Sequence, residues 1–349
     1  MNVSRLAGNG QGRWRGCRRD FGLSRRARSP RTLMTMSESR TTTIRLRDGR
    51  RLAYAEWGDT NGFPIVHCHG MPGSRLEHEA DDGVYASLGV RVITPDRPGY
   101  GLSDSLPGRR LVDWPADVAE LADLLEMPRF AMTALSGGGV FALACAAQIP
   151  ERLTGVVTAG CPAPMYVGGL NEGVKLRFRA GLSLAAHASW LVRAGAEAMA
   201  VAVRRRPEFF VVHANQDNPT DLRWLALPSV RAEATEMIQE GFRSGARGYI
   251  DDVVGLARPW GFALEGIRVP VHLWHGDADT VIPIRQAAYL AAMIPLATLT
   301  ICPGEGHMLM WNHLPEILEM AKGRKGLDRS SPSAPTSPRE APARAAHVA

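Results

Sequence analysis

Short apolar runs alternate with stretches of helical spacing along most of the chain, and this alternation restricts the possible folds more than any other feature. The runs are rich in Val, Ile and Leu and too short for buried helices, so we interpret them as strands of a buried sheet. Strands joined by helices predict an α/β fold with a mostly parallel central sheet and helices on both faces. The predicted strands are 64–68, 90–94, 130–135, 153–157, 269–274 and 297–301. The predicted helices are about 75–88, 112–126, 137–149 and 283–294, and another follows His307.

A β-hairpin is predicted before the first of these strands. Residues 41–47 and 51–57 have strand patterns, and the Asp48-Gly49 pair between them is a turn signal.

The alternation breaks in one long segment, 162–262, where strand patterns are almost absent. Ala and Leu recur there at helical spacing, and Pro228 is placed to open a helix that ends at Gly241. We therefore predict that 162–262 is a helical cap, inserted into one α/β core made of 41–161 and 263–321.

The charge of the chain is concentrated at its two ends. The formal net charge is +6, yet residues 1–40 carry +8 and residues 322–349 carry +4, which leaves −6 on residues 41–321. An acidic body argues against a folded nucleic-acid-binding surface. Both ends are rich in small and polar residues without an apolar period, so we predict a disordered basic extension over 1–40 and a disordered tail over 322–349.

The N-terminal extension admits two other interpretations. Arg18-Arg19 hints at a twin-arginine export signal, but the run SRRAR at 24–28 stands where such a signal needs an apolar region. An organellar transit peptide fits the many Arg residues but not the Gly content. We favour a disordered extension, with Met34 or Met36 as an alternative first residue.

The sequence predicts a cytoplasmic protein without a membrane span. Two uncharged windows, 130–150 and 153–171, contain Gly or Pro clusters and fit buried strand-and-turn segments better than membrane helices. The five Cys residues are odd in number, widely scattered and form no C-x-x-C pair, which is typical of a reduced compartment. The sequence leaves the oligomeric state open.

The run TALSGGG at 133–139 is the strongest functional signal, and it lies between a predicted strand and a predicted helix. Ser136 has small residues two positions away on both sides, as a sharp strand-to-helix turn requires. This is a nucleophile elbow of the type G-x-S-x-G, with Ala134 in place of the first Gly. A Gly-rich phosphate loop is the alternative, but the run lacks the Lys that such a loop uses.

Four further motifs accompany the elbow along the chain. They are HCHGMPGS at 67–74, DRPGYGLSD at 96–104, HGDADTVIP at 275–283 and GEGH at 304–307. Together with the elbow they resemble the α/β-hydrolase family over roughly residues 41–321. The resemblance implies the α/β-hydrolase fold, with the cap inserted between the elbow and the two later motifs.

The resemblance also implies a Ser-Asp-His catalytic triad. Ser136 matches the family nucleophile, Asp279 the acid and His307 the base, in the chain order of this fold. Asp277 is the less favoured alternative for the acid, because the family acid stands three residues after a Gly, here Gly276.

The backbone N–H groups of Met71 and Gly137 match the family's oxyanion hole, and the 96–104 loop matches a structural wall of the site. His67 and His69 could suggest a metal site, but no acidic or Cys partner has metal-ligand spacing nearby, and His69 is interpreted as a structural hydrogen-bonding residue. The triad can perform every proton transfer, so no cofactor and no metal are implied.

Ser at the elbow argues against epoxide hydrolases and haloalkane dehalogenases, whose members use Asp there. We predict a serine hydrolase that cleaves a carboxylic ester or a related acyl bond of a small to medium apolar molecule through an acyl-enzyme. A carbon–carbon bond hydrolase and a proline-type aminopeptidase are alternatives, and a ligand-binding receptor with little turnover is the alternative outside enzymes. An aminopeptidase would hold an amino group with cap carboxylates, for which the sequence offers Glu197, Glu233, Glu236 and Glu240.

Overall fold

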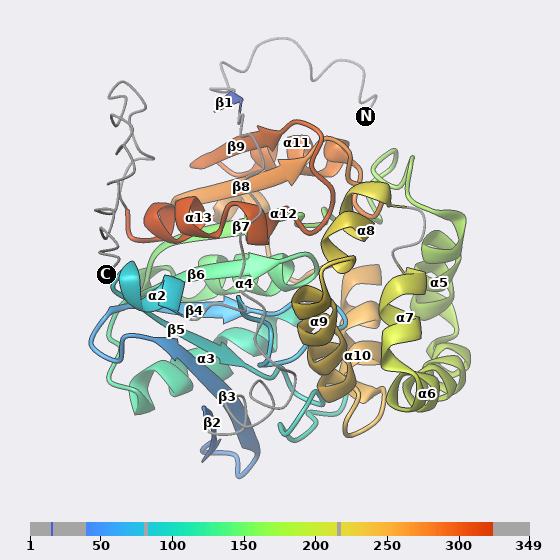
Figure 1. Cartoon of the computed structure of the whole chain (residues 1–349), viewed down its shortest axis with the longest axis horizontal. Coiled ribbons are helices and arrows are strands. Elements are labelled where there is room, and N and C mark those ends of the chain that lie inside the picture. Colours follow the sequence, from blue (N-terminus) through green and yellow to red (C-terminus); the bar gives the residue numbers. More distant parts are fainter. Residues whose placement is uncertain (1–14, 17–39, 80–82, 215–217, 324–349) are drawn as a thin grey trace, which may run out of the picture.

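One sheet organises the structure, a computed structural model that describes residues 15–16, 40–79, 83–214 and 218–323 (Figure 1). Its strand order is β1-β9-β8-β7-β6-β4-β5-β3-β2. All neighbours from β1 through β5 in this order pair in parallel, and β3 pairs antiparallel with β5 and β2. The predicted mostly parallel sheet is therefore confirmed. The strands are β1 (Arg15–Gly16), β2 (Thr41–Arg45), β3 (Arg51–Gly58), β4 (Phe63–Cys68), β5 (Val90–Pro95), β6 (Phe130–Leu135), β7 (Leu153–Ala159), β8 (Val271–Gly276) and β9 (Ala297–Cys302).

The two edges of the sheet differ in origin. At one edge, β2 and β3 form the predicted hairpin, and Gly49 turns the chain with a φ of +88°, which favours glycine. At the other edge, β1 pairs with Thr300 and Ile301 of β9, so two residues of the N-terminal extension that we predicted to be disordered are in a strand. The rest of that extension up to residue 39, and the tail from residue 324, lie outside the described residues.

Helices cover both faces of the sheet, as predicted, because consecutive strand residues point to opposite sides. Val66 and Met132 face the core that α3, α4 and α11 cover, whereas their neighbours Ile65 and Ala131 face the core that α2, α12 and α13 cover. These helices are α2 (Gly83–Ser87), α3 (Trp114–Leu124), α4 (Gly138–Gln148), α11 (Ile284–Met293), α12 (Leu309–Asn312) and α13 (Leu314–Ala321). Short 3₁₀ turns lie at Leu111–Asp113, Pro150–Arg152 and Leu264–Gly266.

The prediction of a helix over 75–88 is wrong for residues 75–79, which are not helical, whereas the described residues 83–87 form α2. The N–H of Arg75 donates to the carboxylate of Asp96 at 2.6 Å, and the N–H of Glu79 donates to the hydroxyl of Tyr85 at 2.8 Å. Side-chain acceptors have thus replaced the backbone carbonyls that a helix would use. Residues 75–79 form a loop, so the apolar spacing of this segment does not reflect a helix.

The described residues between β7 and β8 form six helices and their connections, which we call the insertion. In Figure 1 the insertion lies beside the carboxyl ends of the parallel strands. The predicted helix from Pro228 to Gly241 is confirmed as α9. The insertion helices are α5 (Leu176–His187), α6 (Ser189–Arg205), α7 (Pro207–Ala214), α8 (Pro219–Leu225), α9 (Pro228–Gly241) and α10 (Arg247–Ala257). Within the part of the chain that is described, none of the helices combines the length and apolar character needed to cross a membrane.

Buried charges hold the insertion on the core. Asp252 of α10 accepts hydrogen bonds from the guanidinium groups of both Arg97 and Arg109, and all three side chains are almost fully buried. A second contact joins Glu240 of α9 to Arg75 at 2.7 Å. Because such pairs are costly to separate once they are buried, they fix the insertion relative to the sheet.

Candidate active site

Ser136 lies on the sharp turn between β6 and α4, as the elbow motif predicts. Its φ is +53°, a left-handed conformation that is uncommon outside glycine. The neighbouring helix approaches the sheet closely, since a Cβ on Gly138 would collide with the carbonyl oxygen of Cys68 and one on Gly139 with the Sγ of Cys161. The Gly run therefore lets α4 start directly behind the serine. Ala134, which replaces the usual first Gly, fits here as a fully buried residue of β6.

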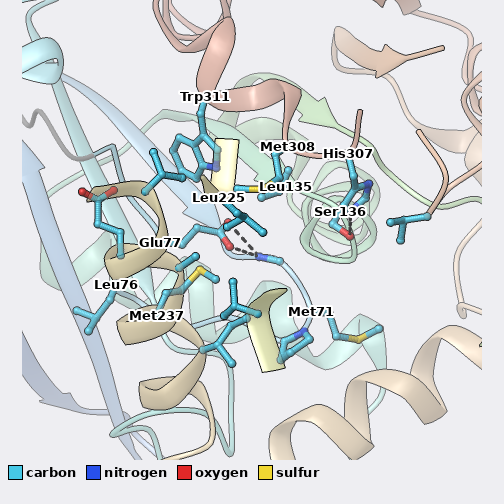
Figure 2. Close-up of a pocket in the computed structure, with 18 of the residues that line it drawn as sticks. Met71, Leu76, Glu77, Leu135, Ser136, Leu225, Met237, His307, Met308 and Trp311 are labelled. Carbon is cyan, nitrogen blue, oxygen red and sulfur yellow. Dashed lines mark hydrogen bonds between the residues drawn. The ribbon is translucent and has the colours of Figure 1, made fainter. Parts of the chain in front are cut away.

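Two loops at the carboxyl ends of β8 and β9 bring Asp279 and His307 to this serine. His307 Nε2 lies 2.8 Å from Ser136 Oγ, and His307 Nδ1 lies 2.7 Å from Asp279 Oδ2. Figure 2 shows the Ser136 and His307 side chains pointing toward each other. The three residues predicted from motifs far apart in the sequence are thus joined in one hydrogen-bonded chain.

The second oxygen of Asp279 is used by the protein itself. Asp279 Oδ1 accepts the N–H groups of Val281 at 2.7 Å and Ile282 at 2.9 Å, which fixes the carboxylate in its plane. Asp277, the alternative acid, is exposed, and its Oδ1 accepts the N–H of Gly304 at 2.6 Å. The geometry therefore favours Asp279 as the partner of His307.

The Asp279–His307 pair shifts the pKa of both members. Burial alone lowers the pKa of His307, but the Asp279 carboxylate and its hydrogen bond outweigh burial, so that this pKa lies above the ordinary value of 6.5. Burial alone raises the pKa of Asp279, but the charge of His307 and its hydrogen bond outweigh burial and bring this pKa below 3.8. The pair thus stabilises a protonated imidazole beside an ionised carboxylate, which is the charge state a serine-activating base passes through.

The loop after β4 places Met71 beside the elbow. A Cβ on Gly137 would lie 2.9 Å from the Cβ of Met71, so the two residues are direct neighbours. Neither backbone N–H donates a hydrogen bond to another of the described residues. Arg97 holds this loop from behind, because its guanidinium donates to the carbonyls of His69 and Gly70. Two free N–H groups beside a nucleophile are what an oxyanion hole requires.

His67 and His69 have other partners than a metal. His67 Nε2 lies 2.9 Å from Glu77 and its Nδ1 lies 2.9 Å from Thr133, while His69 Nδ1 lies 2.9 Å from the carbonyl of Gly70. Over the ranges that the structure describes, no group of three or more His, Cys, Asp or Glu side chains could hold a metal ion.

A pocket of about 260 Å³ opens above Ser136 and His307, between the core and the insertion (Figure 2). Its walls are mostly apolar and combine core residues with residues of α5, α7, α8 and α9. Three carboxylates also line it, from Glu77, Glu79 and Glu233. The apolar walls include Leu76, Leu135, Leu225, Met237, Met308 and Trp311.

Comparison with known proteins identifies the family. The family model described as the alpha/beta hydrolase fold matches residues 64–314. The chain belongs to the α/β-hydrolase family. The predicted resemblance and the predicted fold are therefore confirmed.

The relatives within the α/β-hydrolase family carry several different activities in their names. A non-heme chloroperoxidase of Streptomyces lividans is 28% identical over 292 residues, covering 79% of this chain and 96% of that protein. A proline iminopeptidase of Xylella fastidiosa is 25% identical, covering 74% of this chain and 88% of that protein. The fold also matches a thermophilic esterase from Thermogutta terrifontis with a TM-score of 0.58 at 21% identity, covering 81% of this chain and 97% of that one.

The four cap carboxylates proposed for binding an amino group have different positions. Of these, Glu233 lines the pocket. Glu240 pairs with Arg75, and both oxygens of Glu197 accept the N–H of Ala246. Glu236 is not among the residues that line the pocket.

The sequence analysis missed a carboxylate of the insertion that contacts the loop of His307. Asp221 of α8 accepts the backbone N–H of His307 at 3.0 Å and that of Met308 at 3.0 Å. The sequence signal around it, Asn218-Pro219 followed by Asp221, indicates a capped helix start but does not indicate the contact with the distant base.

Proposed function

We propose that this α/β-hydrolase is a serine hydrolase that cleaves a carboxylic ester or a related acyl bond of a small to medium apolar molecule. The observation that carries the proposal is the chain of contacts from Asp279 through His307 to Ser136 Oγ, at 2.7 and 2.8 Å, on the floor of an apolar pocket. A serine hydroxyl is a weak nucleophile at neutral pH, and a hydrogen-bonded imidazole held by a carboxylate is the arrangement that activates it.

The reaction would proceed in two halves. His307 takes the proton of Ser136 as Oγ attacks the carbonyl carbon, and the Asp279 carboxylate stabilises the resulting imidazolium. The N–H groups of Met71 and Gly137 would receive the negative oxygen of the tetrahedral intermediate, where each such donor contributes a factor of about 10²–10³ in rate. The imidazolium then protonates the leaving alcohol, which leaves an acyl group on Ser136.

In the second half, His307 removes a proton from a water molecule that attacks the acyl carbonyl. A second tetrahedral intermediate forms at the same oxyanion site. Its collapse returns the proton to Ser136 Oγ and releases the carboxylic acid. No atom of the protein is consumed, and no cofactor takes part in these steps.

The pocket supports the substrate class. Aliphatic and aromatic side chains such as Leu225, Met308 and Trp311 favour an apolar group next to the scissile bond. Glu79 and Glu233 in the same wall favour a second candidate, an aminopeptidase-like activity on a substrate with an amino group, and the iminopeptidase relative supports that class. Parallel assays with a p-nitrophenyl acyl ester and a prolyl p-nitroanilide distinguish the two.

We also propose that residues 162–262 act as a cap and that the enzyme works in the cytoplasm. The cap proposal is supported by the pocket walls that the insertion contributes. The location is supported by three buried free cysteines, at 68, 145 and 161, because disulfides are rare in reduced compartments.

The test of the proposed function is labelling with a fluorophosphonate, followed by intact mass. We expect one adduct on the wild type and none on Ser136→Ala, because the reagent reacts with an activated serine. The Ser136→Ala protein should keep its Tm, which excludes unfolding as the reason for lost labelling. A folded wild type that takes no adduct would refute an activated serine and would favour the receptor alternative.

A further inference from the structure

A buried carboxylate of the insertion, Asp221 of α8, contacts the loop that carries His307, and the hydroxyl of Thr220 also donates to the carbonyl of Gly304 in this loop at 3.5 Å. Asp221 Oδ2 accepts the N–H of His307 and Oδ1 accepts the N–H of Met308, both at 3.0 Å. The side-chain amide of Asn218 donates to Oδ2 as well. Asp221 is 1% exposed, so these contacts are sheltered from water. Burial raises the pKa of Asp221 above its ordinary value of 3.8, while the N–H groups of Met308 and His307 and the charge of His307 act in the opposite direction and favour the ionised carboxylate.

The loop is shaped to receive this carboxylate. A Cβ on Gly306 would collide with Asp221 Oδ1, so only glycine leaves room for the contact at the residue before the base. On the opposite side, a Cβ on Gly276 would collide with the carbonyl oxygen of Glu305. The segment that carries His307 is therefore enclosed between β8 and α8. Its ring is oriented by Asp279 from the core, and its backbone is held by Asp221 from the insertion.

Several charged or titratable groups influence His307. Asp279 follows β8, His275 belongs to β8, and Glu77 lies in the loop after β4. Asp221 is the contribution of the insertion, and its charge adds to that of Asp279 in raising the pKa of His307. Glu77 is engaged by the ring of His67 and by the N–H of Gly70, whereas Asp221 contacts the backbone of the base itself.

We propose that Asp221 is a positioning residue of the active site, which fixes His307 against Ser136 and stabilises its protonated form by charge. The proposal rests on the proposed function. It makes the insertion a contributor to the chemistry, in addition to lining the pocket, because α8 supplies this second carboxylate to the base. If Asp221 had a purely structural role, its contacts would be limited to the start of α8, where its N–H donates to Asn218 Oδ1 at 3.4 Å.

Asp221→Asn keeps the size of the side chain but removes its charge and replaces one of its two accepting oxygens by an NH₂ group, so it perturbs both the charge and one backbone contact of the loop. Asp277→Asn is the matched control, since Asp277 also accepts an N–H of this loop, from Gly304, but is exposed and two residues from the acid. The first readout is the titration of the His307 imidazole by NMR, assigned through the signal missing in His307→Gln. The second is the pH profile of kcat/KM on p-nitrophenyl butyrate.

For Asp221→Asn we expect the pKa of His307 to fall by about one unit, because an opposite charge close to a titrating group contributes shifts of this order. The acid limb of the pH profile should move to lower pH by the same amount. On the plateau, kcat should fall on the order of tenfold with little change in KM, because a weaker and less fixed base transfers the proton more slowly. Asp277→Asn should leave the titration and kcat unchanged.

An unchanged His307 titration in a folded Asp221→Asn protein would overturn the proposal, as would an equal shift in Asp277→Asn. The pKa does not depend on the folded fraction, so a partly unfolded preparation still gives the answer. Asp221→Glu retains the charge and should keep the wild-type pKa; a shift as large as that of Asp221→Asn would also contradict the proposal. The NMR titration needs no turnover, so failure of the proposed function, seen as no labelling of the wild type, is distinguishable from failure of the Asp221 assignment.

Discussion

Replacing Asp279 by Asn should abolish most of the activity by reversing the direction of one hydrogen bond. Asp279 Oδ1 accepts two backbone N–H groups, from Val281 and Ile282. In Asp279→Asn the amide oxygen must take this position, because an NH₂ group there would face two donors. The NH₂ group is then directed at His307 Nδ1, which lies 2.7 Å from the present Oδ2. His307 must accept at Nδ1 and carry its proton on Nε2, so it cannot take the proton of Ser136.

The size of the loss follows from this wrong tautomer. A triad whose acid is replaced by its amide loses about 10⁴ in kcat, which corresponds to about 5 kcal/mol of transition-state stabilisation at 1.36 kcal/mol per tenfold. The assay is kcat on p-nitrophenyl butyrate, with Tm as the check on folding. Asp277→Asn is the control, since its amide oxygen can keep the N–H of Gly304, and kcat should stay within about twofold. Equal losses in the two variants would refute the assignment of the acid.

Two further predictions concern pH and stability. Because His307 must be neutral to act as a base and its pKa is raised, kcat/KM should fall as the pH drops through a value above 6.5, and an acid limb at or below 6.5 would contradict the pairing with Asp279. Asp252→Ala leaves Arg97 and Arg109 buried without their shared carboxylate, which should cost about 3–5 kcal/mol and lower the Tm by at least about 6 °C. Asp104→Ala, which removes a partner of the exposed Arg51, should leave the Tm nearly unchanged in the same thermal scan.

The sequence was sufficient for the parts of the fold that depend on local pattern. Every predicted strand is present within about two residues, and the inner strands β4 to β8 were the clearest because a strand buried on both faces has to be apolar throughout. The turn at Gly49 and the helix from Pro228 were also predictable from sequence. Glycine tolerates the positive φ of the turn, and proline favours the first turn of a helix. The helix predicted over 75–88 was wrong because its backbone contacts are not local. Its backbone donors bind Asp96 and Tyr85, which are partners that local spacing does not reveal.

The same distinction applies to the site. Ser136, Asp279 and His307 each follow a strand of a parallel sheet, and the carboxyl ends of such strands meet at one edge, so their motifs predicted a common location. Asp221 precedes His307 by 86 residues and reaches it from a helix outside the sheet. No periodicity connects the two, and only the packing of α8 against the loop after β9 places them together.

The contacts of the insertion bear on how the site can respond to a substrate. Asp252 binds Arg97, which also donates to the carbonyls of His69 and Gly70 in the loop that carries the proposed oxyanion donor. Asp221 binds the backbone of the base. The loop with the proposed oxyanion donor Met71 and the loop with His307 are thus both held by buried carboxylates of the insertion. A displacement of the insertion large enough to break these contacts would expose the Arg97 guanidinium and release the His307 backbone at the same time. Part of the binding energy of a substrate that fills the pocket would therefore be used to keep both loops in place.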